Sequence, residues 1–153
     1  DEELIKNQDD EINYRCIANG FKIFMSPVLT TKYLVRENAI DLSKQYYFYG
    51  LFKPIVFKKV KDGKKIYHYA PPFHLLFSFL SLTLFPLTSY SFYYFFCYLI
   101  ISVFFSYRNN KGIRAINYGV FIFATIHYSY GLGFIVGYLK SLLELIYPKQ
   151  NYN

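Results

Sequence analysis

The sequence predicts the tail of an α/β domain followed by an all-α transmembrane region of about three helices. Three observations support this fold class. Residues 66–107 form a run of 42 positions without Asp, Glu, Lys or Arg, and residues 115–139 form a second run of 25. At ~1.5 Å per residue the first run makes roughly 60 Å of helix, about twice the ~30 Å hydrocarbon core of a bilayer. The first 65 residues, in contrast, hold 12 of the 17 basic and 9 of the 10 acidic side chains.

Residues 1–37 are predicted to be the end of the α/β domain. An acidic turn, apolar residues at helical spacing and Gly20 at a capping position predict a helix over residues 9–19. Residues 21–25 and 28–35 are rich in β-branched and aromatic side chains and are expected to form two short strands. This half is too small to enclose a sizeable core. The chain also begins without an initiator Met, so we expect a C-terminal fragment of a longer protein.

Residues 38–65 are predicted to lie at a membrane surface. Asn38, with Asp41 three residues on, predicts a helix start. The helix over residues 39–52 carries five aromatic rings and is expected to lie among the headgroups, the alternative being a soluble helix packed against another domain. Residues 53–65 hold six Lys and one Asp beside an apolar run, which favours anionic lipid headgroups over nucleic acid as the partner.

Residues 66–147 are predicted to be the transmembrane region. Pro71 and Pro72 suit the first turn of a helix, and Pro86 suits a turn between the first two spans. The first limb is short, so a partly re-entrant hairpin stays open, and a misread Pro86 turn changes the count to two or four spans. Basic loops on both sides of the hairpin are assigned to the cytoplasm by the positive-inside bias. The expected spans cover residues 72–86, 90–107 and 115–139.

Other chemistry-bearing residues are scattered. The three histidines and the two cysteines show no metal-ligand spacing, so no metal site is expected in this chain. His127 lies within the third span and is expected to hydrogen-bond to a neighbouring helix. Cys16 and Cys97 are expected to be reduced thiols. Gly133 and Gly137, at four-residue spacing, permit close helix contact.

An acidic cluster over residues 7–15 is the candidate catalytic motif. Its string Asn-Gln-Asp-Asp-Glu-Ile-Asn-Tyr-Arg resembles the acidic motif of family 2 glycosyltransferases. In that family an acidic pair, one spacer, another acid and an Arg four positions later open a helix at the acceptor side of the active site. The matching positions in this chain are Gln8 and Asp9 for the pair, Asp10 for the spacer, Glu11 for the second acid and Arg15 for the Arg. Gln8 departs from the usual acid, and an ordinary acidic first turn is the alternative.

The resemblance extends to membrane-bound, exopolysaccharide-type members similar to succinoglycan synthesis enzymes. Residues 45–50, Gln-Tyr-Tyr-Phe-Tyr-Gly, look like the end of their catalytic domain, and residues 130–134 look like a stretch of their last transmembrane helix. Gln45, Tyr46 and Tyr49 are therefore candidates for the acceptor side or the membrane interface. Because aromatic residues stand where processive synthases carry Arg and Trp, the resemblance does not imply processivity.

The resemblance implies an inverting enzyme with a GT-A-like domain, of which this chain holds only the tail. A sugar would pass from a nucleotide-sugar donor to a lipid-linked or polysaccharide acceptor. Asp9 would be the general base that takes the proton of the acceptor hydroxyl, while Glu11 and Arg15 would orient and neutralise. A divalent metal, Mg²⁺ or Mn²⁺, is expected in the full-length enzyme with its ligands outside this chain, so that the fragment alone is inactive.

The resemblance also implies a location and leaves one competing class of function. The expected location is the bacterial inner membrane, with multi-pass anchoring and the catalytic side in the cytoplasm. The competing class is a small, non-enzymatic membrane scaffold or anchor. It predicts no nucleotide-sugar domain upstream of this chain.

Overall fold

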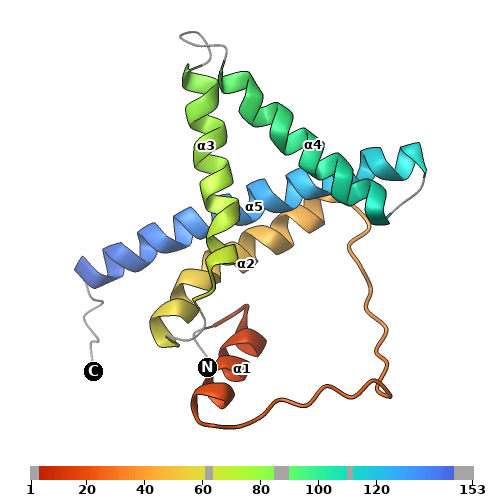
Figure 1. The fold of residues 1–153 in the computed structure, drawn as a ribbon. Helices are drawn as coiled ribbons and strands as arrows, with labels where there is room; N and C mark the ends of the chain where they lie inside the picture. Colours follow the sequence, from red (N-terminus) through yellow and green to blue (C-terminus); the bar gives the residue numbers. More distant parts are fainter. Residues whose placement is uncertain (1–3, 61–63, 85–89, 110–111, 147–153) are drawn as a thin grey trace.

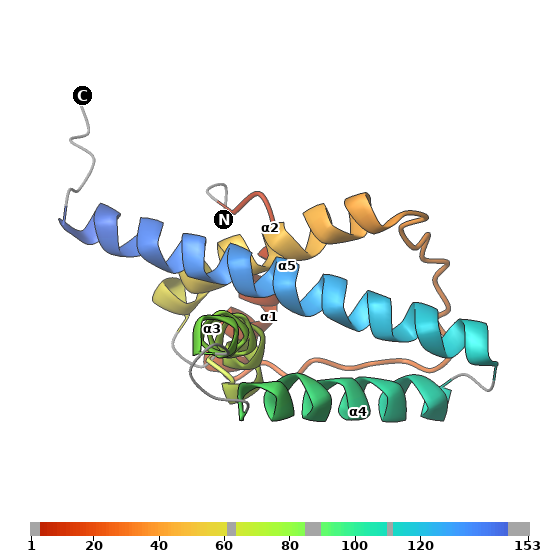
Figure 2. The ribbon, with the colours of Figure 1, turned by 90° about the horizontal axis from the view of Figure 1, so that it is seen from above.

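A computed structural model describes residues 4–60, 64–84, 90–109 and 112–146, whose helices gather around one long helix (Figure 1). The elements are α1 (Gln8–Ala18), α2 (Ala39–Lys59), the 3-10 helix η2 (Ile66–Tyr69), α3 (Ala70–Leu84), α4 (Ser91–Asn109) and α5 (Ile113–Ile146). α2 runs beside α5, and the two views together show α3 crossing this pair while α4 slants back to the start of α5 (Figures 1 and 2). α1 lies on the opposite side of the pair from α3 and α4.

The expected α/β tail is wrong, because the described residues contain helices and no strand. Residues 21–25 and 28–35, expected to be strands, are irregular and almost wholly exposed. A strand is stable only when a neighbouring strand satisfies its backbone hydrogen bonds, and the described chain offers these segments no such neighbour. The domain boundaries expected after residues 37 and 65 stay predictions.

α1 forms within one residue of its expected range and ends as its sequence predicts. Gly20 has a φ of 83°, a conformation that glycine adopts without strain. The Phe21 N–H donates to the Cys16 carbonyl and the Gly20 N–H to the Ile17 carbonyl, both at 3.0 Å. These two bonds make a Schellman motif, which confirms Gly20 as the helix cap.

α2 begins at the predicted cap and runs further than predicted. The Asn38 side chain accepts the Asp41 N–H at 2.8 Å and donates to the Asp41 carboxylate at 2.8 Å, which confirms the helix start. The helix continues beyond Phe52 and through Pro54 to Lys59. Proline removes a helical hydrogen bond, but Pro54, Val56 and Phe57 are buried, and this packing stabilises the last turns.

Glycines bring the backbones of α2 and α5 into direct contact. A Cβ added to Gly133 would lie within 3.0 Å of the Tyr47 carbonyl, and one on Gly137 within 3.0 Å of the Leu51 carbonyl. From the other helix, a Cβ on Gly50 would collide with the backbone of Tyr130. The close helix contact predicted at Gly133 and Gly137 is confirmed, and the helix that packs there is α2.

α3 and α4 stand on α5 as an apolar hairpin, a name used below for residues 70–84 and 91–109. The expected Pro86 turn lies outside the described residues. Hydrogen bonds from side-chain hydroxyls tie the hairpin to α5. Ser78 Oγ lies 2.9 Å from Tyr128 Oη, Ser106 Oγ donates to the Ile116 carbonyl at 2.9 Å, and Tyr98 Oη lies 3.0 Å from His127 Nδ1. The last contact confirms that His127 bonds to a neighbouring helix.

One helix in the described part of the chain is long and apolar enough to cross a membrane. It is the stretch Ile113–Leu143 of α5, 31 residues long, and it contains the third expected span. α3 has 15 residues, and the apolar part of α4, Phe92–Arg108, is also shorter than a full span. Helix length in the described residues therefore supports one crossing rather than the three that we expected.

The glycine contact predicts that Gly133→Ala destabilises the fold. Alanine is the better helix former by about 1 kcal/mol, but its Cβ would push α2 away. We expect the free energy of unfolding to fall by about 1–3 kcal/mol, measured by circular dichroism in mild detergent. The matched control is Gly112→Ala, whose Cβ would meet nothing within 4 Å. Equal stability of the two variants would contradict direct backbone contact.

Candidate functional site

A polar cavity of about 480 Å³ lies where α1, α2, η2 and α5 meet. It brings together segments that are far apart in the sequence. Its walls come from the start of α1, from the middle of α2, from η2 and from the midpoint of α5. The lining residues are Lys6, Asn7, Gln8, Asp9, Asp10, Tyr46, Tyr49, Lys53, His68 and Tyr130. Three of the site residues predicted from the sequence, Asp9, Tyr46 and Tyr49, therefore line one cavity.

The start of α1 is docked onto α2 by two polar contacts. Asn7 has a φ of 65°, which asparagine tolerates better than most residues, and its amide donates to the Tyr49 carbonyl at 2.9 Å. The Asp10 carboxylate pairs with the Lys53 ammonium, whose side chain is only 5% exposed. A buried ammonium needs a paired carboxylate, so this ion pair fixes α1 against the middle of α2.

The two neighbouring aspartates differ in their partners. Asp10 forms an ion pair with Lys53, although its position in the motif is that of the spacer. Asp9 is exposed to the cavity and has no ion pair with a described residue. It also lies in the first turn of α1, at the positive end of the helix dipole. Asp9 is therefore the carboxylate that is free to accept a proton from a bound molecule.

Glu11 and Arg15 lie outside the cavity lining and bind each other. Glu11 is 5% exposed. Its two carboxylate oxygens lie 3.1 Å and 3.2 Å from Arg15 Nε and Nη2. The pairing expected from their spacing is confirmed, and its two-point geometry stabilises α1 internally. Their expected orienting role toward an acceptor stays a prediction.

Gln45 positions the cavity wall rather than forming it. Its amide donates to the hydroxyls of Tyr49 at 2.9 Å and Tyr33 at 3.0 Å, and its carbonyl oxygen accepts from Arg36 Nε at 3.0 Å. Tyr46 packs edge-to-face on Tyr49 at 5.7 Å between ring centres. Gln45 thus anchors the Tyr49 ring and ties α2 to the irregular segment that follows α1.

Outside α5, His68 is the cavity residue whose pKa departs furthest from its ordinary value. Burial, followed by the nearby Lys53 ammonium, lowers the pKa of His68 to about 4, so the imidazole is neutral near pH 7. Burial and the neighbouring Tyr49 raise the pKa of Tyr46. The cavity therefore combines charged side chains, those of Lys6, Asp9, Asp10 and Lys53, with the neutral imidazole of His68 and the tyrosine hydroxyls.

Two residues that line the cavity each have a buried polar atom without a protein partner. His68 Nε2 and Tyr130 Oη make no hydrogen bond to the described residues. Unsatisfied buried polar groups are unfavourable, so the described residues leave the hydrogen bonding beside the cavity incomplete. Sequence analysis missed both residues. Tyr130 opens the stretch 130–134 that carried the resemblance, and this was the one signal that pointed to it.

The described residues do not offer a divalent metal site. They contain no group of three or more His, Cys, Asp or Glu side chains able to hold an ion. Asp10 is already paired with Lys53. A metal on a donor diphosphate would have to be held by residues outside this part of the chain.

Comparison of the chain with protein-family models, with curated proteins and with solved structures gave no match.

The distinct partners of the two aspartates predict different stabilities for Asp10→Asn and Asp9→Asn. Both substitutions remove one charge from the first turn of α1, so the helix-dipole effect is matched. Asp10→Asn also leaves the buried Lys53 without its carboxylate. We expect it to lower the free energy of unfolding by about 2 kcal/mol more than Asp9→Asn, less than a fully buried pair because Asp10 is partly exposed. Equal unfolding curves in detergent would contradict the pairing.

The lowered pKa of His68 predicts a pH dependence. In the unfolded chain the His68 imidazole takes up a proton near pH 6.5, whereas in the folded chain it does so only near pH 4. The free energy of unfolding therefore falls as the pH drops from 6.5 to 4. NMR of histidine-labelled protein should give a midpoint near pH 4 that is assigned to His68 by its loss in His68→Gln. The variant should also show a shallower loss of stability between pH 6.5 and 4. A His68 midpoint near 6.5 would refute burial.

Proposed function

We propose that this chain is the acceptor-side, membrane-bound portion of a glycosyltransferase that moves a sugar from a nucleotide-sugar donor to a lipid-linked or polysaccharide acceptor. One observation carries the proposal. The resemblance to family 2 glycosyltransferases selects Asp9 from one segment and Tyr46 and Tyr49 from another, and these residues line a single polar cavity. If residues 9–11 were only an ordinary acidic first turn of a helix, there would be no reason for Asp9 to line the same cavity as Tyr46 and Tyr49.

The chemistry proposed for Asp9 is proton removal in an inverting displacement. The acceptor oxygen bonds to the anomeric carbon, the bond from that carbon to the nucleoside diphosphate breaks, and Asp9 takes the hydroxyl proton. Neutral His68 and Tyr130 offer hydrogen bonds to other acceptor hydroxyls. The Asp10–Lys53 pair and the Glu11–Arg15 pair hold α1 in place, so Asp9 is presented from a fixed helix end.

We assign the donor and its divalent metal to residues outside this chain, so the chain alone is inactive. The irregular segment after α1 supports a covering partner. Phe24, Met25 and Leu34 are 87%, 88% and 89% exposed, and such a concentration of exposed apolar side chains marks an interaction surface. The scaffold alternative draws on the same segment, since a separate partner protein would cover it equally well.

The proposed location is the cytoplasmic face of a bacterial inner membrane. The basic residues that flank the apolar hairpin support this orientation by the positive-inside bias. Of the multi-pass arrangement expected from the sequence, the proposed reaction needs only that the apolar hairpin enters the bilayer. A lipid-linked acceptor then reaches the cavity by diffusion in two dimensions.

The proposal predicts that Asp9→Asn abolishes sugar transfer by the full-length protein. Loss of a general base should reduce kcat by roughly 10²- to 10⁴-fold with little change in stability. Transfer of radiolabelled sugar from nucleotide sugars to a membrane lipid extract measures this. Glu37→Gln is the matched control, because Glu37 is an exposed carboxylate outside the cavity. Undiminished transfer by Asp9→Asn would exclude Asp9 as the base. Absence of transfer from the unsubstituted protein as well as from both variants would favour the scaffold alternative.

A further inference from the structure

The polar cavity lies at the middle of the longest apolar helix. α5 runs from Ile113 to Ile146, and Tyr130, which lines the cavity, lies at its midpoint. α1 docks at the same level, because Asp10 pairs with Lys53 and Gly50 of α2 touches the Tyr130 backbone. The polar helix α1 is therefore docked on α2 at the level of the centre of α5 and not near either end.

A crossing by α5 would carry this polar layer into the hydrocarbon. α2 runs alongside α5 over the same stretch, from Ser43 opposite Ser129 to Lys58, whose ammonium donates to the Ser141 carbonyl. With Tyr130 near the bilayer midplane, Asp9, Asp10 and Lys53 would lie at that depth too. Each charge at the centre costs about 2.5–3.5 kcal/mol even on the mildest scale. Length and apolar composition permit α5 to cross, but its neighbours oppose a crossing.

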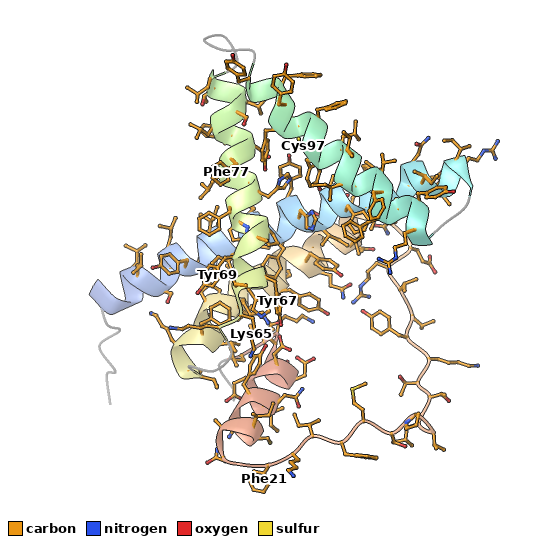
Figure 3. All side chains as sticks on the ribbon, in the orientation of Figure 1. Phe21, Lys65, Tyr67, Tyr69, Phe77 and Cys97 are labelled. Carbon is orange, nitrogen blue, oxygen red and sulfur yellow. The ribbon has the colours of Figure 1, made fainter. Side chains whose placement is uncertain are left out.

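The apolar hairpin has the opposite character. The chain carries no charged side chain from Ile66 to Tyr107. Large apolar side chains are exposed on both limbs, among them Phe79 at 69% and Phe92 at 60%. Figure 3 shows Phe77 and Cys97 on the hairpin, on the far side of α5 from Phe21 in the polar segment. A helix pair that is apolar all round is suited to lipid.

We infer that the chain enters the bilayer from one side through the apolar hairpin alone, while α2 and α5 lie along the headgroup layer and the cavity faces water. At ~1.5 Å per residue the limbs are roughly 22 Å and 28 Å long, enough to penetrate deeply but short of a ~30 Å core. This inference concerns membrane geometry and does not depend on sugar transfer.

Charge and shape at the base of the hairpin fit an anionic bilayer. Exposed basic residues lie next to the chain ends of the hairpin: Lys64 and Lys65 shortly before α3, Arg108 in the last turn of α4 and Arg114 at the start of α5. Near anionic headgroups each such cation gains about 1 kcal/mol. An apolar groove of about 370 Å³ runs between α3 and the second half of α5, lined by residues such as Leu76 and Leu139. A lipid acyl chain of the same leaflet fills such a groove.

Cysteine labelling of the full-length protein in sealed membrane vesicles of both orientations tests this geometry. Single cysteines are kept or introduced in an otherwise cysteine-free protein and treated with a membrane-impermeant maleimide. Ile113→Cys and Leu143→Cys mark the ends of α5, where the native side chains are 73% and 55% exposed. Native Cys16 on α1 and native Cys97 on α4 mark the polar layer and the hairpin.

The expected result is that both ends of α5 react from the same side as Cys16, and that Cys97 reacts only after detergent is added. Reaction of Ile113→Cys and Leu143→Cys from opposite sides would show that α5 crosses and would overturn the inference. Equal reaction of Cys97 and Cys16 in intact vesicles would overturn insertion of the hairpin. Tyr118→Cys and Lys140→Cys, at exposed positions outside the groove, repeat the test inside the helix ends if an end variant fails to fold. None of these outcomes bears on the activity of Asp9→Asn, so the two proposals fail separately.

Discussion

The direct backbone contact between α2 and α5 is the constraint on which the remaining structure depends. Three glycines within seven residues of α5 serve two neighbours: Gly133 and Gly137 face α2, while Gly131 faces the Pro71 carbonyl at the foot of α3. A side chain at any of them would separate the helices by more than ordinary side-chain adjustment absorbs. The same short stretch of α5 therefore joins the aromatic helix to the apolar hairpin and sets the position of each relative to the other.

The cavity follows from this contact together with one ion pair. Because α2 and α5 approach closely, Tyr46 and Tyr49 line the same cavity as Tyr130, and Lys53 is buried at the edge of the contact between the two helices. A buried ammonium must find a carboxylate, and Asp10 supplies it only if α1 docks across α2. When α1 docks in this way, the neighbouring residue Asp9 lines the cavity. The packing of apolar helices thereby determines where a charged side chain is available for chemistry.

Local signals in the sequence predicted helices and helix ends. Features that depend on contacts between residues far apart in the sequence could not be predicted. The Asn38 cap and the Gly20 cap depend on a few adjacent residues, and both are confirmed. The strands expected at 21–25 and 28–35 are wrong because propensity does not supply a pairing partner. The helix expected over residues 39–52 continues through Pro54 to Lys59, because packing against α5 stabilises its last turns. Lys53 and His68 belong to the cavity only through contacts that sequence spacing cannot reveal.

A surface position for α5 also gives the cavity a physical reason to be polar on one side and aromatic on the other. Asp9 comes from α1 and Lys6 from the segment before it, on the side that we infer to face water, while Tyr130 belongs to the helix that we infer to rest on the headgroups. The lipid-linked acceptor that we propose, with its polar end above the headgroups and its chain below them, would meet both sides at once. Tyrosine is suited to that depth because its ring is apolar and its hydroxyl is wet. The unsatisfied Tyr130 hydroxyl then lies at the height where the first polar atoms of such a molecule emerge from the lipid.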